Sequence, residues 1–230
     1  MTKIHVMSPY DGPVRESRIR VAGRTIALVR PGDPDRLLDD PEVAAWNAAT
    51  DYMPYWAHLW PAAFLLAEAV AARAWPAGLS ALEIGSGLGL PGLVGVAAGL
   101  RVRFTDHDLT PLRFVERSVR ANGFDPDAVS TALLDWDDPP PEHYPLILGA
   151  DVTYERRLVP MVARAIAALL GPDGEALIAD PDRVAAQGFG EAVGVLGLAI
   201  ESTPALADSD ELGPIRGTIH RVWRPGPTRG

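Results

Sequence analysis

The chain has 230 residues, 47 % hydrophobic and 22 % charged, which suits one soluble α/β domain with a full core. A formal net charge of −9 and the lack of a long Lys/Arg cluster argue against a nucleic-acid partner, and the absence of cysteine excludes disulfides and thiolate zinc sites. No apolar run reaches membrane-spanning length and no signal peptide is evident, so we expect a cytoplasmic protein with no membrane partner.

The first part of the chain carries weak periodicity. We expect a loose lead-in over 1–17, a hairpin over 19–29 turning at Gly23, an acidic turn-rich loop over 31–41 and a short helix over 42–49. Together, residues 1–53 are too few for a separate core. We therefore expect an N-terminal extension packed on a main domain formed by residues 54–230.

Aromatic residues gather just before the next helix, in Pro54-Tyr-Trp56-Ala-His58-Leu-Trp60-Pro61. Pro61 fits the first turn of a helix that runs to about Ala74. Two interpretations are open for the aromatic side chains: a hydrophobic plug against the edge of a sheet, or a lid whose indoles cover a bound cofactor.

A glycine-rich turn organises the chain. The apolar run 81–84 predicts a buried strand, and the Gly/Ala-rich segment 90–100 predicts a helix, as in a mononucleotide-binding unit. Gly87-x-Gly89-x-x-Gly92 fits the dinucleotide fingerprint of nicotinamide enzymes. Counted from the end of the strand, however, Glu83-x-Gly85-x-Gly87-x-Gly89 resembles the first motif of class I S-adenosylmethionine-dependent methyltransferases.

Strands and helices alternate after this turn. We expect strands at 101–105, 129–134, 146–150, 175–179, 199–203 and 218–223, and helices at 110–122, 155–170 and 184–196. The last two strands form an antiparallel pair joined by an acidic loop. The fold class is therefore α/β, a doubly wound, Rossmann-like seven-stranded sheet, mostly parallel, with helices on both faces.

Polar residues fall where ligands bind in such sheets, beyond the carboxyl ends of the strands. Asp106 lies about twenty residues after the glycine turn, where a carboxylate accepts hydrogen bonds from both ribose hydroxyls. Trp136 could stack on adenine while Asp135 or nearby backbone reads its amino edge, although a core tryptophan is the alternative. Asp151 and Tyr154 follow the fourth strand, and a turn there would point both toward the cleft.

These motifs together resemble lysine methyltransferase family 16 of the seven-strand methyltransferases, and within it most closely the electron-transfer flavoprotein β-subunit lysine methyltransferase group. The resemblance rests on residues 54–61, 82–87, Asp106 with Asn122, 134–136, 148–154 and 180–183. It implies S-adenosyl-L-methionine as cofactor, bound by Trp60, Gly85, Gly87, Asp106, Trp136 and Ala150, and a substrate lysine channel containing Asp151 and Tyr154. We also place Glu83, Ser86, His107 and Asp135 among the candidate cofactor-binding residues.

The expected reaction is methyl transfer to the lysine of a protein substrate. A lysine must first lose a proton, because the ammonium has no lone pair and its ordinary pKa is about 10.4. A dry vestibule of Tyr55, Trp56 and Tyr154 would lower that pKa, and Asp151 would orient the amine or attract the ammonium. His58 is a possible proton acceptor, more often structural, and no cluster suggests a metal.

Other functions remain open from the sequence. A methyltransferase for a small amine or hydroxyl acceptor would share the same cofactor site, and a nicotinamide-dependent oxidoreductase is the remote alternative. A non-catalytic binding module is the least favoured. The oligomeric state, monomer or dimer, is not encoded in any motif.

Overall fold

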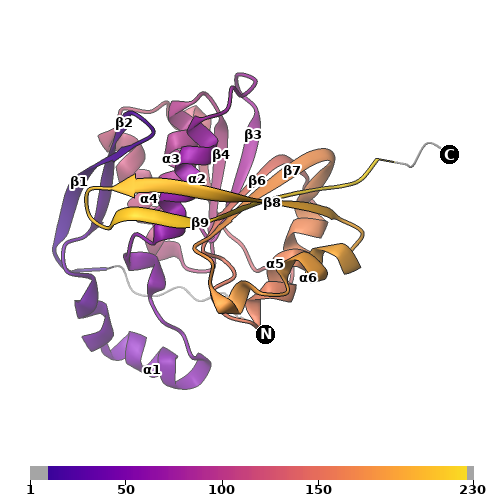
Figure 1. The fold of residues 1–230 in the computed structure, drawn as a ribbon. Helices are drawn as coiled ribbons and strands as arrows, with labels where there is room; N and C mark the ends of the chain where they lie inside the picture. Colours follow the sequence, from indigo (N-terminus) through magenta and orange to yellow (C-terminus); the bar gives the residue numbers. More distant parts are fainter. Residues whose placement is uncertain (1–9, 227–230) are drawn as a thin grey trace.

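The computed structural model describes residues 10–226, and its centre is a seven-stranded sheet (Figure 1). Its strands are β3 (Ser80–Ile84), β4 (Arg101–Asp106), β5 (Val129–Leu133), β6 (Tyr144–Ala150), β7 (Leu170–Asp180), β8 (Ala199–Ser209) and β9 (Gly213–Trp223). They lie in the order β5-β4-β3-β6-β7-β9-β8, and β9 runs antiparallel to both neighbours. The predicted doubly wound fold is confirmed. The strand order reverses between β3 and β6, the place where open α/β sheets bind ligands.

Helices cover both faces of the sheet. α2 (Pro61–Ala71), α3 (Leu90–Ala97) and α4 (Leu109–Ala121) share one hydrophobic cluster, whereas α5 (Leu158–Leu169) and α6 (Phe189–Val195) belong to another. Alternate side chains of β6 divide between the two clusters, because successive residues of a strand point to opposite faces. The sheet is therefore buried on both sides and presents its strand ends as the accessible edge.

The N-terminal segment packs mainly on the helices α2, α3 and α4, which cover one face of this sheet. The predicted hairpin is present as β1 (Val14–Val21) and β2 (Arg24–Pro31), and the predicted short helix as α1 (Pro41–Thr50). The segment expected to be only a loop contains a 3₁₀ helix, Pro34–Asp39, that buries Leu37. Residues 1–9 of the expected lead-in lie outside the described residues.

Several boundaries differ from the sequence prediction. The helix expected over 184–196 is wrong: a 3₁₀ turn, Val184–Ala186, precedes Gly188 at φ 96°, and only then does α6 begin. The helix expected from residue 155 begins at Leu158, and β7 begins five residues earlier than predicted, at Leu170.

The acidic loop expected between the last strands is mostly strand. β8 and β9 pair from Ala199↔Trp223 to Ser209↔Gly213, and the hairpin extends across α2 toward β1 (Figure 1). Ion pairs join its tip to the N-terminal hairpin: Arg20 to Asp210, and the buried Arg30 to Glu211. Packing against the N-terminal hairpin gives the polar segment 204–217 an extended structure that its sequence does not predict.

Candidate active site

The glycine-rich turn joins β3 to α3 at the edge of a cavity of about 280 Å³. Gly85, Gly87 and Gly89 have φ of 58°, 50° and 74°, a region that L side chains rarely adopt. A Cβ on Gly85 would lie 3.1 Å from the Trp136 ring, so the backbone itself forms this wall of the cavity. The turn therefore brings main chain close to whatever the cavity holds.

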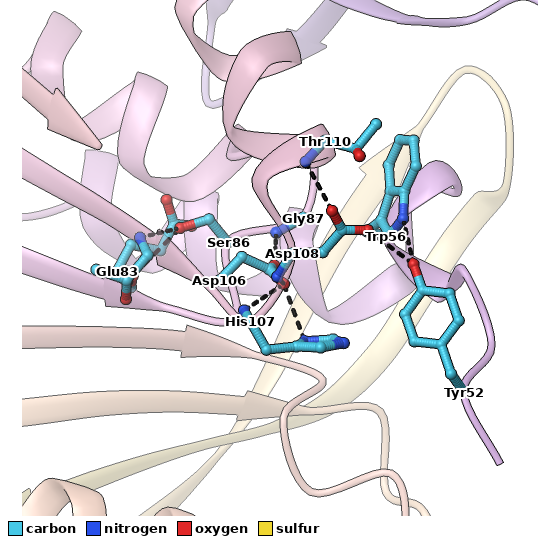
Figure 2. Close-up of polar contacts among 10 residues, drawn as sticks. Tyr52, Trp56, Glu83, Ser86, Gly87, Asp106, His107, Asp108 and Thr110 are labelled. Atoms are coloured by element: carbon cyan, nitrogen blue, oxygen red, sulfur yellow. Dashed lines mark hydrogen bonds and ion pairs between the residues drawn. The ribbon is translucent and has the colours of Figure 1, made fainter. Parts of the chain in front are cut away.

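The Asp106 carboxylate is held by the turn it faces (Figure 2). Its Oδ2 accepts the amide of Gly87 at 3.0 Å, and its Oδ1 accepts the amide of His107 at 2.8 Å. The His107 Nδ1 also lies 3.0 Å from Oδ1. Burial disfavours the imidazolium, but the hydrogen bond to Asp106 and the surrounding carboxylates outweigh it and raise the pKa of His107. Asp106 thus stands fixed at the end of β4 with lone pairs still available.

Glu83 is the least satisfied polar group near the cavity. It is 2 % exposed, and its Oε2 has no hydrogen-bond partner among the described residues. Burial raises the pKa of Glu83 to about 8, although the Gly92 amide opposes the shift. A buried, orphaned carboxylate oxygen is costly. This oxygen is closed off from the cavity and faces α3, where a Cβ on Gly92 would stand 2.3 Å from it.

A buried hydrogen-bond chain fixes the aromatic segment above the turn (Figure 2). Trp56 Nε1 donates to the Tyr52 hydroxyl at 3.1 Å, and that hydroxyl donates to Asp108 Oδ2 at 2.7 Å. Asp108 is fully buried and its other oxygen caps α4 through the Thr110 amide at 2.8 Å. The Trp56 backbone in turn lies over Gly87, 3.6 Å from where a Cβ would stand. The segment is therefore anchored to the same elements that hold Asp106.

Asp151 lines the same cavity, directly after β6, with φ of 57°. Both of its oxygens accept from Arg183: Nε to Oδ1 at 2.6 Å and Nη2 to Oδ2 at 2.8 Å. Asp180, at the end of β7, accepts the Arg183 amide at 2.7 Å and the Thr153 hydroxyl at 3.1 Å. Burial raises the pKa of Asp180 despite these bonds. The strand-end carboxylates therefore brace one another through Arg183.

Three aromatic rings, those of Tyr55, Trp60 and Tyr154, also line the cavity. Tyr55 and Tyr154 meet edge to face with centroids 5.3 Å apart, and Trp60 lies 5.9 Å from Tyr55. The Trp60 Nε1 donates to the Tyr55 carbonyl at 2.7 Å. Burial, followed by the nearby Glu155 charge, raises the pKa of the Tyr154 hydroxyl, so it stays neutral. The cavity lining therefore combines aromatic rings with the Arg183–Asp151 ion pair.

The predicted site residues meet in this one cavity, with one exception. Those that line it are Trp60, Glu83, Gly85, Ser86, Gly87, Asp106, His107, Trp136, Ala150, Asp151 and Tyr154. Asp135 is not among its lining residues: its Oδ1 accepts the Asp137 amide at 2.9 Å and closes a turn. Ser86 also has a structural task, since its hydroxyl accepts the Thr105 amide at 3.0 Å and ties the turn to β4.

Trp56 and His58 also line the cavity, but each has a partner outside it. The buried Trp56 donates to Tyr52, while the exposed His58 lies with Nε2 3.8 Å from Asp35. Sequence reasoning gave no role to Arg183 or Glu155, although both line the cavity. The available signal for Arg183 was its place just after the Asp180 strand end.

The geometry can be compared with known proteins. The profile of the lysine methyltransferase family matches residues 38–191, about two thirds of the chain. The chain belongs to this family. The predicted family is thereby confirmed, and it disfavours the nicotinamide alternative. The finer likeness to the electron-transfer flavoprotein β-subunit group stays a prediction.

Two curated proteins that are similar to this chain are named as lysine methyltransferases. Mouse EEF1A lysine methyltransferase 3 is 29 % identical over 133 residues, covering 50 % of this chain and 57 % of that protein. Mouse protein N-lysine methyltransferase METTL21A is 39 % identical over 84 residues, covering 34 % and 38 %. The chain thus matches 57 % of the length of the first relative and 38 % of the second, less than two thirds of either.

Solved structures share the fold. The Thermus thermophilus 16S rRNA N2 G1207 methyltransferase RsmC, solved with AdoMet and guanosine, has a TM-score of 0.63 at 16 % identity and covers 94 % of this chain and 52 % of its own. A TehB-like S-adenosylmethionine-dependent methyltransferase from Corynebacterium glutamicum has a TM-score of 0.55 at 17 % identity, covering 84 % and 100 %.

Proposed function

We propose that this protein is an S-adenosylmethionine-dependent protein-lysine N-methyltransferase. The observation that carries the proposal is a single cavity that is lined both by Asp106 with the glycine turn and by Asp151 with Tyr154. Membership of the lysine methyltransferase family and the names of the curated relatives support it. A cofactor and an acceptor bound in one cavity could then react without the methyl group passing through solvent.

The cofactor end suits S-adenosylmethionine, which supplies an electrophilic methyl group on a sulfonium. Asp106 would accept hydrogen bonds from the two ribose hydroxyls, because a fixed carboxylate at this strand position faces the ribose of a bound nucleoside. The half-buried Trp136 would pack against the adenine. Glu83 also lines the cavity, and its carboxyl would lie beside a cationic or N–H group of the cofactor. These assignments use groups that the folded chain leaves available.

At the acceptor end, the protein's own contribution is alignment, dryness and a route for the proton. Tyr55 and Tyr154 would flank the lysine stem and exclude water, which lowers the pKa of an enclosed amine. Asp151 would accept one N–H of the amine and orient its lone pair. Neither tyrosine needs to ionise for these tasks.

The test is incubation of the full chain with tritiated S-adenosylmethionine and a proteome extract, and in a parallel reaction with a metabolite pool in place of the extract. We expect label in protein, recovered as methyl-lysine after hydrolysis, and none with the Asp106→Ala variant. Label confined to small molecules would replace this function with the alternative small-acceptor methyltransferase. No transfer to either pool would refute both.

A further inference from the structure

An ion pair between Arg183 and Asp151 forms part of the cavity wall. Arg183 forks onto both carboxylate oxygens, and the side chains are 34 % and 5 % exposed, respectively. The two residues lie 32 positions apart in the chain, on the segments that follow β7 and β6. A bidentate guanidinium–carboxylate pair is stronger and better oriented than a single ionic contact.

The guanidinium is itself held in place. The Arg183 main-chain amide is fixed by Asp180, and its guanidinium carbon lies 5.5 Å from the centre of the Trp60 ring. Asp151 is fixed as well, because its amide donates to the Ala179 carbonyl at 2.9 Å. The pair is therefore a built feature of the cavity wall, present before any acceptor enters.

Such a pair changes what Asp151 can attract. A lone buried carboxylate would bind an alkylammonium, whereas a carboxylate already neutralised by a guanidinium offers little net charge. An incoming ammonium would also meet the Arg183 cation at short range. The carboxylate keeps unused lone pairs, so it can still accept an N–H from an uncharged amine.

We propose that Arg183 is a positioning residue that neutralises Asp151 and so makes this end of the cavity bind the acceptor lysine as an uncharged amine. The inference rests on the proposed lysine-methylating function and names the charge state in which its substrate is bound. The ammonium passes its proton to bulk water before it enters, and the ion pair neither gains nor loses a proton.

Other ionisable groups face the same space. Around Arg183 these are Asp180 after β7, Tyr55 in the aromatic segment and, along the cavity, Tyr154, Glu155, His58, His107, Glu83 and Asp106. Tyr154 stays neutral to high pH, whereas burial raises the pKa of Glu83 to about 8 and the hydrogen bond to Asp106 raises the pKa of His107. The test must therefore compare variants that retain these groups.

The experiment measures binding of n-butylamine, a lysine side-chain probe, to the full chain saturated with S-adenosylhomocysteine, by ligand-observed NMR at pH 7 and pH 9. If only the uncharged form binds, apparent affinity rises about 100-fold over this interval, because the probe is mostly protonated below about pH 10.4. We expect at least a 10-fold rise for the wild type. The Arg183→Lys variant keeps the cation and should keep the rise.

The Arg183→Gln variant should bind n-butylammonium at pH 7 at least 5-fold more tightly than the wild type and lose most of the rise. Arg164→Gln is the matched control, because Arg164 pairs with Asp137 at 3.0 Å on exposed surface, and it should behave as the wild type. Glu83 and His107 are common to all variants, so their titration cancels in the comparison.

Several results would overturn the inference. The first is a wild-type affinity for n-butylamine that changes less than 3-fold between pH 7 and pH 9, and this check holds even if Arg183→Gln does not fold. The second is an equal pH profile for the wild type and Arg183→Gln. The third is no binding of n-butylamine at all. Binding of S-adenosylhomocysteine, measured first by calorimetry, separates this failure from failure of the proposed function. If the nucleoside binds and the probe result is negative, only the role of Arg183 is lost.

Discussion

Removing the Tyr52 hydroxyl should destabilise the protein strongly, because that one oxygen joins two buried polar groups. Tyr52→Phe deletes the bond from Trp56 Nε1 at 3.1 Å and the bond to Asp108 Oδ2 at 2.7 Å. Tyr52 and Trp56 are each 7 % exposed and Asp108 is 0 % exposed, so water cannot easily replace either bond. The ring itself keeps its packing in the variant.

The magnitude follows from the two partners left behind. An unsatisfied buried donor or acceptor costs about 1–3 kcal/mol, toward the upper end when the group is a carboxylate. We therefore expect a loss of about 3 kcal/mol in the free energy of unfolding. For a chain of this size, that loss corresponds to a melting temperature lower by about 6–12 °C.

Urea denaturation followed by tryptophan fluorescence, with calorimetry for the melting temperature, provides the measurement. Tyr10→Phe is the matched control, because the Tyr10 hydroxyl donates to the Pro13 carbonyl at 3.0 Å in an exposed position and its loss should cost less than about 0.5 kcal/mol. If Tyr52→Phe costs no more than Tyr10→Phe, the buried chain from Trp56 to Asp108 does not stabilise the fold.

Three further outcomes are expected. The pKa of Glu83 is about 8 in the folded protein, above its unfolded value, so its contribution to stability is present below about pH 4.5 and is lost as pH rises to 8. Glu83→Gln should remove this loss, which amounts to about 2–3 kcal/mol in the free energy of unfolding between pH 6 and 8. Urea denaturation of both proteins at the two pH values measures it. Gly92→Ala would place a Cβ 2.3 Å from Glu83 Oε2 and 2.4 Å from Phe104 Cε1, so it should destabilise the fold by about 1–3 kcal/mol in the same assay, and a neutral result would show that the helix can shift. Trp136→Ala should weaken S-adenosylhomocysteine binding by about 1–3 kcal/mol in calorimetry, whereas unchanged affinity would favour a purely structural tryptophan.

The order of strands and helices could be predicted because each element of the main domain carries its own local pattern. Buried runs such as 81–84 and 146–150 end at glycine or aspartate, and the intervening helices carry apolar residues at helical spacing. The same rule placed Asp106 and Asp151 at strand ends, and parallel strands bring such ends to one edge.

The errors arose where tertiary contacts decide the local structure. Gly188 at φ 96° divides the helix expected over 184–196, and the polar segment 204–217 becomes strand because it pairs in register and packs near β1. Asp135 resembles the other strand-end carboxylates in sequence but turns to its own backbone neighbour.

Pairings between distant residues also carry no local signature. Tyr52 and Asp108 are 56 positions apart, and Arg183 and Asp151 are 32 apart. Each of these side chains is ordinary in its own segment. Only the fold shows that the first pair links the aromatic segment to α4 and that the second lies in the wall of the cavity.

The central claim is that Asp106 and the glycine turn bind the nucleoside of S-adenosylmethionine. Calorimetric titration of the full chain with S-adenosylhomocysteine, beside the Asp106→Asn and Asp106→Ala variants, tests it most directly. Hydrogen bonds to a charged group contribute about 1.5–3 kcal/mol each, so loss of two should weaken binding at least about 100-fold in Asp106→Ala, with a smaller loss in Asp106→Asn. No binding by the wild type, or equal affinity in all three proteins, would contradict the account.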